Sequence, residues 1–193
     1  QEVSKMLVDV PIEQWKNYLR FHAIDAAASD LSDEFVAENF EFYSKTLHGQ
    51  KEMKPRWKQV LGAINSEAGE ALGQMYVDVA FPPEAKAQME VLVGNLGTAL
   101  KTRIEQLSWM SDDTRQKALA KGETFTPKVG YPDKWRDWSG LSTSRDSYLG
   151  NVQAAETFNY KWDLGKIGKP VDKTEWGMPP QMVNAQYNPL NND

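Results

Sequence analysis

Hydrophobic residues recur at intervals of three and four along most of the chain, the spacing of amphipathic helices. Several of these stretches begin at residues suited to a helix start: Pro11 and Pro55 at a first helical turn, Ser32 and Ser111 as N-caps. The stretches cover 11–26, 32–48, 55–79, 84–107, 111–122 and 147–164. The sequence therefore predicts a mainly α fold, a multi-helix domain with long amphipathic helices and few short strands.

The third helical stretch contains two glycines four residues apart, Gly69 and Gly73. Each glycine weakens a helix interior by roughly 1 kcal/mol relative to alanine. We therefore expect the helix to break or bend at this point.

Two short stretches show a different pattern. Met182–Tyr187 alternates as a half-buried strand does, and Phe125–Tyr131 hints at a strand interrupted by Pro127. A buried strand needs a partner for its backbone N–H and C=O groups, and this chain offers few. We interpret residues 1–180 as a helical domain. Residues 181–193 are interpreted as the first edge strand of a second domain that is absent from the chain, so that this strand is orphaned.

Composition excludes several classes of partner. The 193 residues are 40% hydrophobic, which suffices for a core, and the net charge is −5. Both signs of charge are spread along the chain without a basic stripe, which argues against a nucleic-acid partner. No apolar run reaches the roughly 20 residues that a membrane-spanning helix needs.

Residues that bind metals are scarce. The chain has no cysteine and two histidines, His22 and His48, with no H-E-x-x-H pattern. His22 lies on the apolar face of a predicted helix and His48 in the last turn of another, where a packing role and the helix dipole account for them. We expect no metal ligand, no cofactor and no catalytic residue in this chain.

A family resemblance rests on an ordered series of motifs towards the C-terminus. They are Trp109-Met110 with Thr114-Arg115, Ala118 and Lys121; Val129-Gly130-Tyr131-Pro132-Asp133; Tyr148 with Asn151; Pro170-Val171-Asp172-Lys173 with Glu175-Trp176, Met178 and Pro180; and Val183-Asn184-Ala185 with Tyr187-Asn188-Pro189 and Asn191. In this order and spacing they resemble the neprilysin family of zinc metallopeptidases. The part from Pro11 to Ser108 is similar to the same family less specifically.

The resemblance implies a function for the parent protein. In that family a helical domain covers a thermolysin-like catalytic domain, and the two enclose a chamber that admits short peptides. The chain would be the helical part of a bacterial zinc metalloendopeptidase that hydrolyses oligopeptides in an extracytoplasmic compartment. Its zinc ligands and catalytic residues would lie outside this chain, in the missing C-terminal catalytic domain, so the chain alone would be inactive.

The resemblance also implies two substrate-binding residues. The terminal strand would pair with an extended peptide by strand addition, whose affinity comes from main-chain hydrogen bonds. Asn184 would bind the substrate backbone through its side-chain amide, which both donates and accepts, and Ala185 would offer its carbonyl.

Two other interpretations stay open. The chain could be a non-enzymatic helical module that binds a peptide or protein, or its parent could be a homologue with broken zinc ligands. The sequence that follows in the parent separates the three, because an H-E-x-x-H motif there supports the peptidase.

Overall fold

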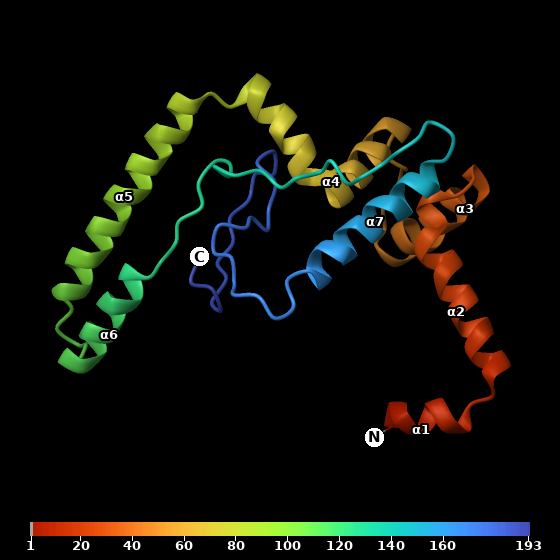
Figure 1. Ribbon diagram of the computed structural model, residues 1–193, viewed down its shortest axis with the longest axis horizontal. Coiled ribbons are helices and arrows are strands. Elements are labelled where there is room, and N and C mark those ends of the chain that lie inside the picture. The colour runs from red at the N-terminus through yellow and green to blue at the C-terminus, as the bar shows by residue number, and fades with distance from the viewer. Residues whose placement is uncertain (1) are drawn as a thin grey trace. The chain divides into compact units, whose positions relative to one another are not determined.

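The computed structural model describes residues 2–193 and is built from helices joined by irregular segments (Figure 1). In chain order they are α1 (Glu2–Asp9), α2 (Ile12–Ala27), the 3-10 helix η1 (Ala28–Asp30), α3 (Asp33–Asn39), the π-helix η2 (Phe40–Leu47), α4 (Arg56–Ala80), α5 (Pro83–Glu105), α6 (Asp112–Glu123) and α7 (Tyr148–Leu164). The prediction of a mainly α fold is confirmed.

The helix starts follow the residues that the sequence marks to within one residue: Pro11 and Pro55 each precede the first residue of their helices, α2 and α4. Ser111 precedes α6, and its hydroxyl accepts a hydrogen bond from the Thr114 backbone N–H at 3.3 Å, as an N-cap does. Ser32 holds the same position before α3 but caps no backbone N–H. Its hydroxyl donates instead to the Glu34 carboxylate at 3.1 Å, so the expected side-chain cap is wrong there.

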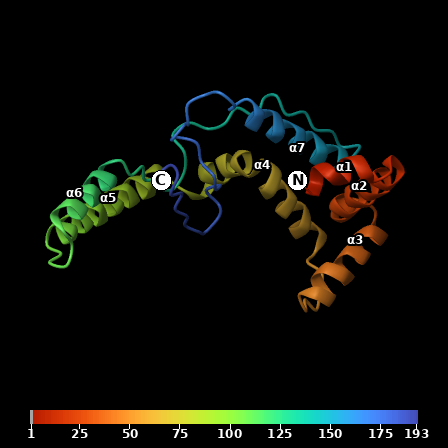
Figure 2. The same ribbon diagram turned by 90° about the horizontal axis from the view of Figure 1, so that it is seen from below.

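The expected bend in the third helical stretch is confirmed. Ala68 interrupts α4 with φ −135° and ψ 35°, one residue before Gly69, and the two segments of α4 point in different directions (Figure 2). The residues after the bend include both glycines of the pair, Gly69 and Gly73, and both are buried.

The short strands expected at Phe125–Tyr131 and Met182–Tyr187 are absent, and residues 2–193 contain no strand. An extended segment becomes a strand only when a second one pairs with it along its length. Here one backbone hydrogen bond, from Thr126 N–H to the Asn192 carbonyl at 3.0 Å, joins the two regions. That single bond does not build a ladder.

The chain divides into two compact units, Gln1–Leu61 with Leu141–Thr157, and Gly62–Gly140 with Phe158–Asp193. In the first unit, the hydroxyl of Tyr43 donates to the Asp25 carboxylate and so ties η2 to α2. In the second unit, α5 and α6 pack side by side (Figures 1 and 2).

Burial of the apolar stripes is far less complete than their periodicity suggests. Ala28 and Ala155 are the buried hydrophobic residues among those described, whereas Leu47 is 58% and Leu96 61% exposed. A helix stripe is buried only where another element covers it, and α6 covers one side of α5. Much of the apolar surface of these stripes therefore stays uncovered within residues 2–193.

Candidate functional site

The two predicted substrate-binding residues lie in an exposed irregular segment of the second unit. Val183, Asn184 and Ala185 are all exposed. The Asn184 side-chain oxygen accepts a hydrogen bond from the Ala185 backbone N–H at 2.8 Å. Within residues 2–193 the Asn184 side-chain N–H groups and the Ala185 carbonyl form no hydrogen bond, so both groups that the resemblance assigns to substrate are accessible.

Beyond these residues the chain is fixed to the end of α6 through Asn192. Its side-chain amide donates to the Lys121 carbonyl and the Thr124 hydroxyl, both at 2.9 Å. Its backbone carbonyl accepts from Thr126, and its side-chain oxygen accepts from the Tyr187 hydroxyl at 3.1 Å. Asn192 holds a left-handed backbone conformation with φ 57°, which asparagine tolerates better than most residues.

Before these residues the chain is fixed to α4. Pro179 lies against Gly69 and Pro180 against Gly73. The Gln181 side-chain amide donates to the Asn65 side-chain oxygen at 2.7 Å and to the Gly69 carbonyl at 2.9 Å. The segment that holds Asn184 and Ala185 is thus anchored on both sides by the same unit.

A half-buried arginine, Arg136, joins the loop before this segment to the helices. Arg136 lies 4.4 Å from the ring centroid of Trp138, 4.6 Å from that of Phe158 and 4.5 Å from that of Trp162. Its backbone N–H donates to the Glu70 carboxylate at 2.6 Å. Burial lowers the pKa of the Arg136 guanidinium, while the negative charge of Glu70 opposes that change. The cluster connects residues after the α4 bend to α7.

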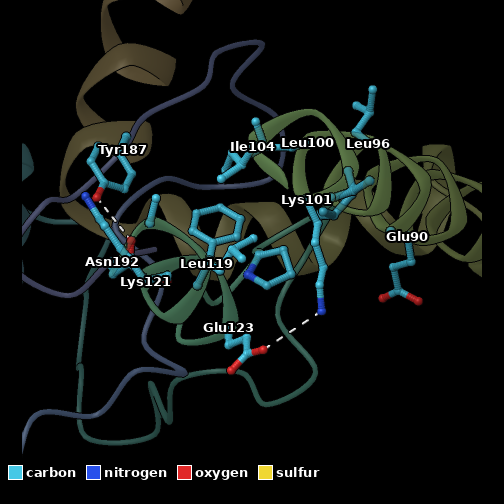
Figure 3. A pocket seen from close by; sticks show the side chains of 18 residues that line it. Glu90, Leu96, Leu100, Lys101, Ile104, Leu119, Lys121, Glu123, Tyr187 and Asn192 are labelled. Atoms are coloured by element: carbon cyan, nitrogen blue, oxygen red, sulfur yellow. Dashed lines mark hydrogen bonds and ion pairs between the residues drawn. The ribbon is translucent and has the colours of Figure 1, made fainter. Parts of the chain in front are cut away.

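An apolar groove of about 920 Å³ lies along α5 and α6 in the same unit (Figure 3). Its walls carry Leu96, Leu100, Ile104 and Leu119, and Gly94 and Gly97 form part of its lining. Lys101 and Glu123 form an ion pair at 4.0 Å on one side of the groove. Tyr187 and Asn192 of the terminal segment line the other side. The groove and the candidate substrate segment therefore share residues.

The histidines do not converge on a metal site. His22 packs against Tyr18, with 4.2 Å between ring centroids, and a ring nitrogen of His48 lies 2.5 Å from the Tyr43 carbonyl oxygen. Over residues 2–193 no group of three or more His, Cys, Asp or Glu side chains could hold a metal ion. The described residues thus do not fit a zinc ion. In the same range no helix is long and apolar enough to span a membrane.

Sequence reasoning missed three parts of this region. The contact between the Gly69 and Gly73 pair and the prolines, the Arg136 cluster and the apolar groove all join residues distant in sequence. The signal for the first was available, since two glycines four residues apart lie on one helix face. Gly94 and Gly97, three residues apart in α5, gave a similar sequence signal for the groove.

Comparison with known proteins identifies relatives over nearly the whole chain. The model of Peptidase family M13 matches residues 1–132. Neprilysin-3 of Drosophila melanogaster is 31% identical over 183 residues, which cover 91% of this chain and 23% of that protein. Neutral endopeptidase of Lactobacillus helveticus is 32% identical over 184 residues, covering 94% of this chain and 28% of that protein.

Solved structures agree with this assignment. The zinc metalloprotease ZMP1 of Mycobacterium tuberculosis in complex with an inhibitor is 43% identical, with a TM-score of 0.89; the match covers 99% of this chain and 29% of that one. PEPO of Lactobacillus rhamnosis is 28% identical, also with a TM-score of 0.89, and the match covers 100% of this chain and 31% of that one. The chain thus spans between about a quarter and a third of the length of these relatives.

Proposed function

Because the chain belongs to peptidase family M13, we propose that it forms the non-catalytic helical part of a zinc metalloendopeptidase that hydrolyses oligopeptides. In such an enzyme zinc activates a water molecule for attack on the peptide bond. The residues described here do not hold that ion, and their proposed task is to enclose the substrate and bind its backbone. An extracytoplasmic location belongs to the same proposal.

The observation that carries this proposal is the exposure of Asn184 and Ala185 in a segment anchored on both sides. An extended peptide beside this segment finds an amide that donates and accepts, and a carbonyl that accepts. The small side chain of Ala185 lets the peptide backbone approach. We propose that the helical domain comprises residues 1–180. The edge strand of the catalytic domain then comprises residues 181–193, which include Asn184 and Ala185.

The missing C-terminal catalytic domain is the proposed partner of the groove along α5 and α6. Most residues that line the groove are apolar, and Leu100 in it is 59% exposed. Leu96, which also lines the groove, is 61% exposed, and neighbouring exposed apolar side chains of this kind are a feature of interaction sites. The relatives are three to four times longer than the chain, so a full-length protein of their size has further residues that can cover the groove.

Replacing Asn184 in the full-length peptidase tests the proposal. Loss of one substrate hydrogen bond in a desolvated cleft costs about 1–3 kcal/mol, so Asn184→Ala should lower kcat/KM by roughly tenfold to a hundredfold. Zinc content, measured by elemental analysis, should not change because Asn184 is not a ligand. Asn17→Ala, at an exposed position of α2, is the control and should leave kcat/KM unaltered.

Two outcomes would count against the proposal. If Asn184→Ala lowers the melting temperature but leaves kcat/KM normal at low temperature, Asn184 pairs with its own protein and not with substrate. If the full-length protein binds no zinc and cleaves no peptide, the chain belongs to a non-enzymatic binding protein or to a homologue with broken zinc ligands.

A further inference from the structure

We propose that Gly73, together with Gly69, is a positioning residue for the substrate-binding segment. The two glycines and the prolines packed on them, Pro179 and Pro180, are called the proline seat below. The inference rests on the proposed function for the roles of Asn184 and Ala185. It assigns to the seat the task of fixing where these two residues lie.

The seat has no room for a side chain at Gly73. A Cβ atom there would lie 2.6 Å from Cδ of Pro180 and 2.7 Å from the Gln181 side-chain oxygen, closer than real contacts allow. At Gly69 it would lie 3.2 Å from Cγ of Pro179, which is tight. A proline ring cannot rotate away as a flexible side chain can, because it is closed onto its own backbone. An added methyl group therefore displaces the connector itself.

The space at Gly73 is not a general property of α4. At Gly62, in the same helix before the bend, an added Cβ would meet no atom within 4 Å. Glycine weakens a helix interior relative to alanine, so glycine at position 73 is explained by the proline that lies on it. Both seat glycines are buried, as expected of a contact that excludes solvent.

Hydrogen bonds fix the orientation of the connector on the seat. Gln181 donates to Asn65 and to the Gly69 carbonyl. The Met182 backbone N–H donates to the Pro179 carbonyl at 3.0 Å, which closes a turn over the prolines. The chain is thereby held up to Met182, two residues before Asn184. Two residues span at most about 7 Å, so a displacement of the prolines moves the point from which Asn184 is reached.

Substrate binding by strand addition is sensitive to such a displacement. Main-chain hydrogen bonds require donor and acceptor within about 3.2 Å and near-linear geometry. A misplacement of about 1 Å caused by a change remote from the chemistry can lower the rate by roughly a hundredfold. The seat therefore acts on substrate through Asn184 and Ala185 without touching it.

The test compares Gly73→Ala with a rescue variant and a control in the full-length peptidase. Gly73→Ala should raise KM and lower kcat/KM by about tenfold or more, with zinc content unchanged. The double variant Gly73→Ala/Pro180→Ala removes the ring atoms that the new methyl group would meet, and it should recover most of kcat/KM. Gly62→Ala should leave both constants unchanged.

Several outcomes overturn the inference. Normal KM in Gly73→Ala at a temperature where it is folded shows that the seat is structural alone, and so does a double variant no better than the single one. If Gly73→Ala does not fold, Pro180→Ala alone tests the seat from the other side. It leaves empty the space that the new methyl group fills in the double variant, so it should loosen the connector, and an unchanged KM then contradicts the inference. If Asn184→Ala is impaired and Gly73→Ala is not, this inference fails while the proposed function stands; if Asn184→Ala is normal, the proposed function fails first.

Discussion

At the scale of single residues, Arg136 illustrates how one side chain joins distant segments. Its flat guanidinium lies against three aromatic rings, a geometry that the compact ammonium group of lysine does not reproduce. Arg136→Lys should therefore lower the free energy of unfolding by about 1–2 kcal/mol despite its unchanged charge. Urea denaturation of the 193-residue chain, followed by tryptophan fluorescence, measures this. Arg103→Lys on exposed α5 should change it by less than about 0.5 kcal/mol, and equal losses in the two variants would contradict the role given to the rings.

At the scale of elements, α3 and α6 begin at serines in the same position with different contacts. The Ser111 hydroxyl accepts a hydrogen bond from the Thr114 backbone N–H, whereas the Ser32 hydroxyl donates one to the Glu34 carboxylate. Ser111→Ala should thus lower the free energy of unfolding by about 1 kcal/mol, as loss of an N-cap does, and Ser32→Ala by less. Thermal denaturation followed by circular dichroism at 222 nm compares the two. A loss at Ser32 equal to or larger than that at Ser111 would contradict the greater stabilising role given to the Ser111 cap.

What the sequence reveals about the elements follows from the range of the interactions. Helix starts such as Ser111 and the bend near Gly69 depend on neighbours a few residues away, and both were predictable. The contact of Gln181 with Gly69 joins residues 112 positions apart, and no local pattern encodes it. The strand expected at Met182–Tyr187 does not form within the described residues, because alternation describes a face and not the partner, which is proposed to lie in the absent domain. Asn184 and Ala185 were proposed through motif resemblance, since their neighbours' periodicity says nothing about substrate.

At the scale of the whole molecule, the described chain leaves much apolar surface uncovered. If the catalytic domain covers the groove along α5 and α6, a polar side chain there matters only in the full-length peptidase. Leu100→Gln should cost the full-length protein about 2 kcal/mol of folding free energy, and the 193-residue chain less than about 0.5 kcal/mol. Denaturation midpoints of both forms give the comparison.

A matched control separates the groove from exposed surface elsewhere in the same unit. Val79 is 88% exposed and does not line the groove, so Val79→Gln should be nearly neutral in both forms. If Leu100→Gln is neutral in the full-length peptidase as well, the groove remains open there and the proposed partner is wrong.

The two glycines of α5 that line the groove, Gly94 and Gly97, determine which substitutions a selection for thermostability would favour. An added methyl group at Gly94 or Gly97 would meet no atom within 4 Å, so alanine at either position should strengthen the helix of the isolated chain. A laboratory search for thermostable variants of the 193-residue chain would therefore enrich these substitutions. The same methyl groups would occupy space in the groove that the full-length peptidase is proposed to fill. Selection for stability of the 193-residue chain and selection for stability of the full-length peptidase would then favour different residues at the same two positions.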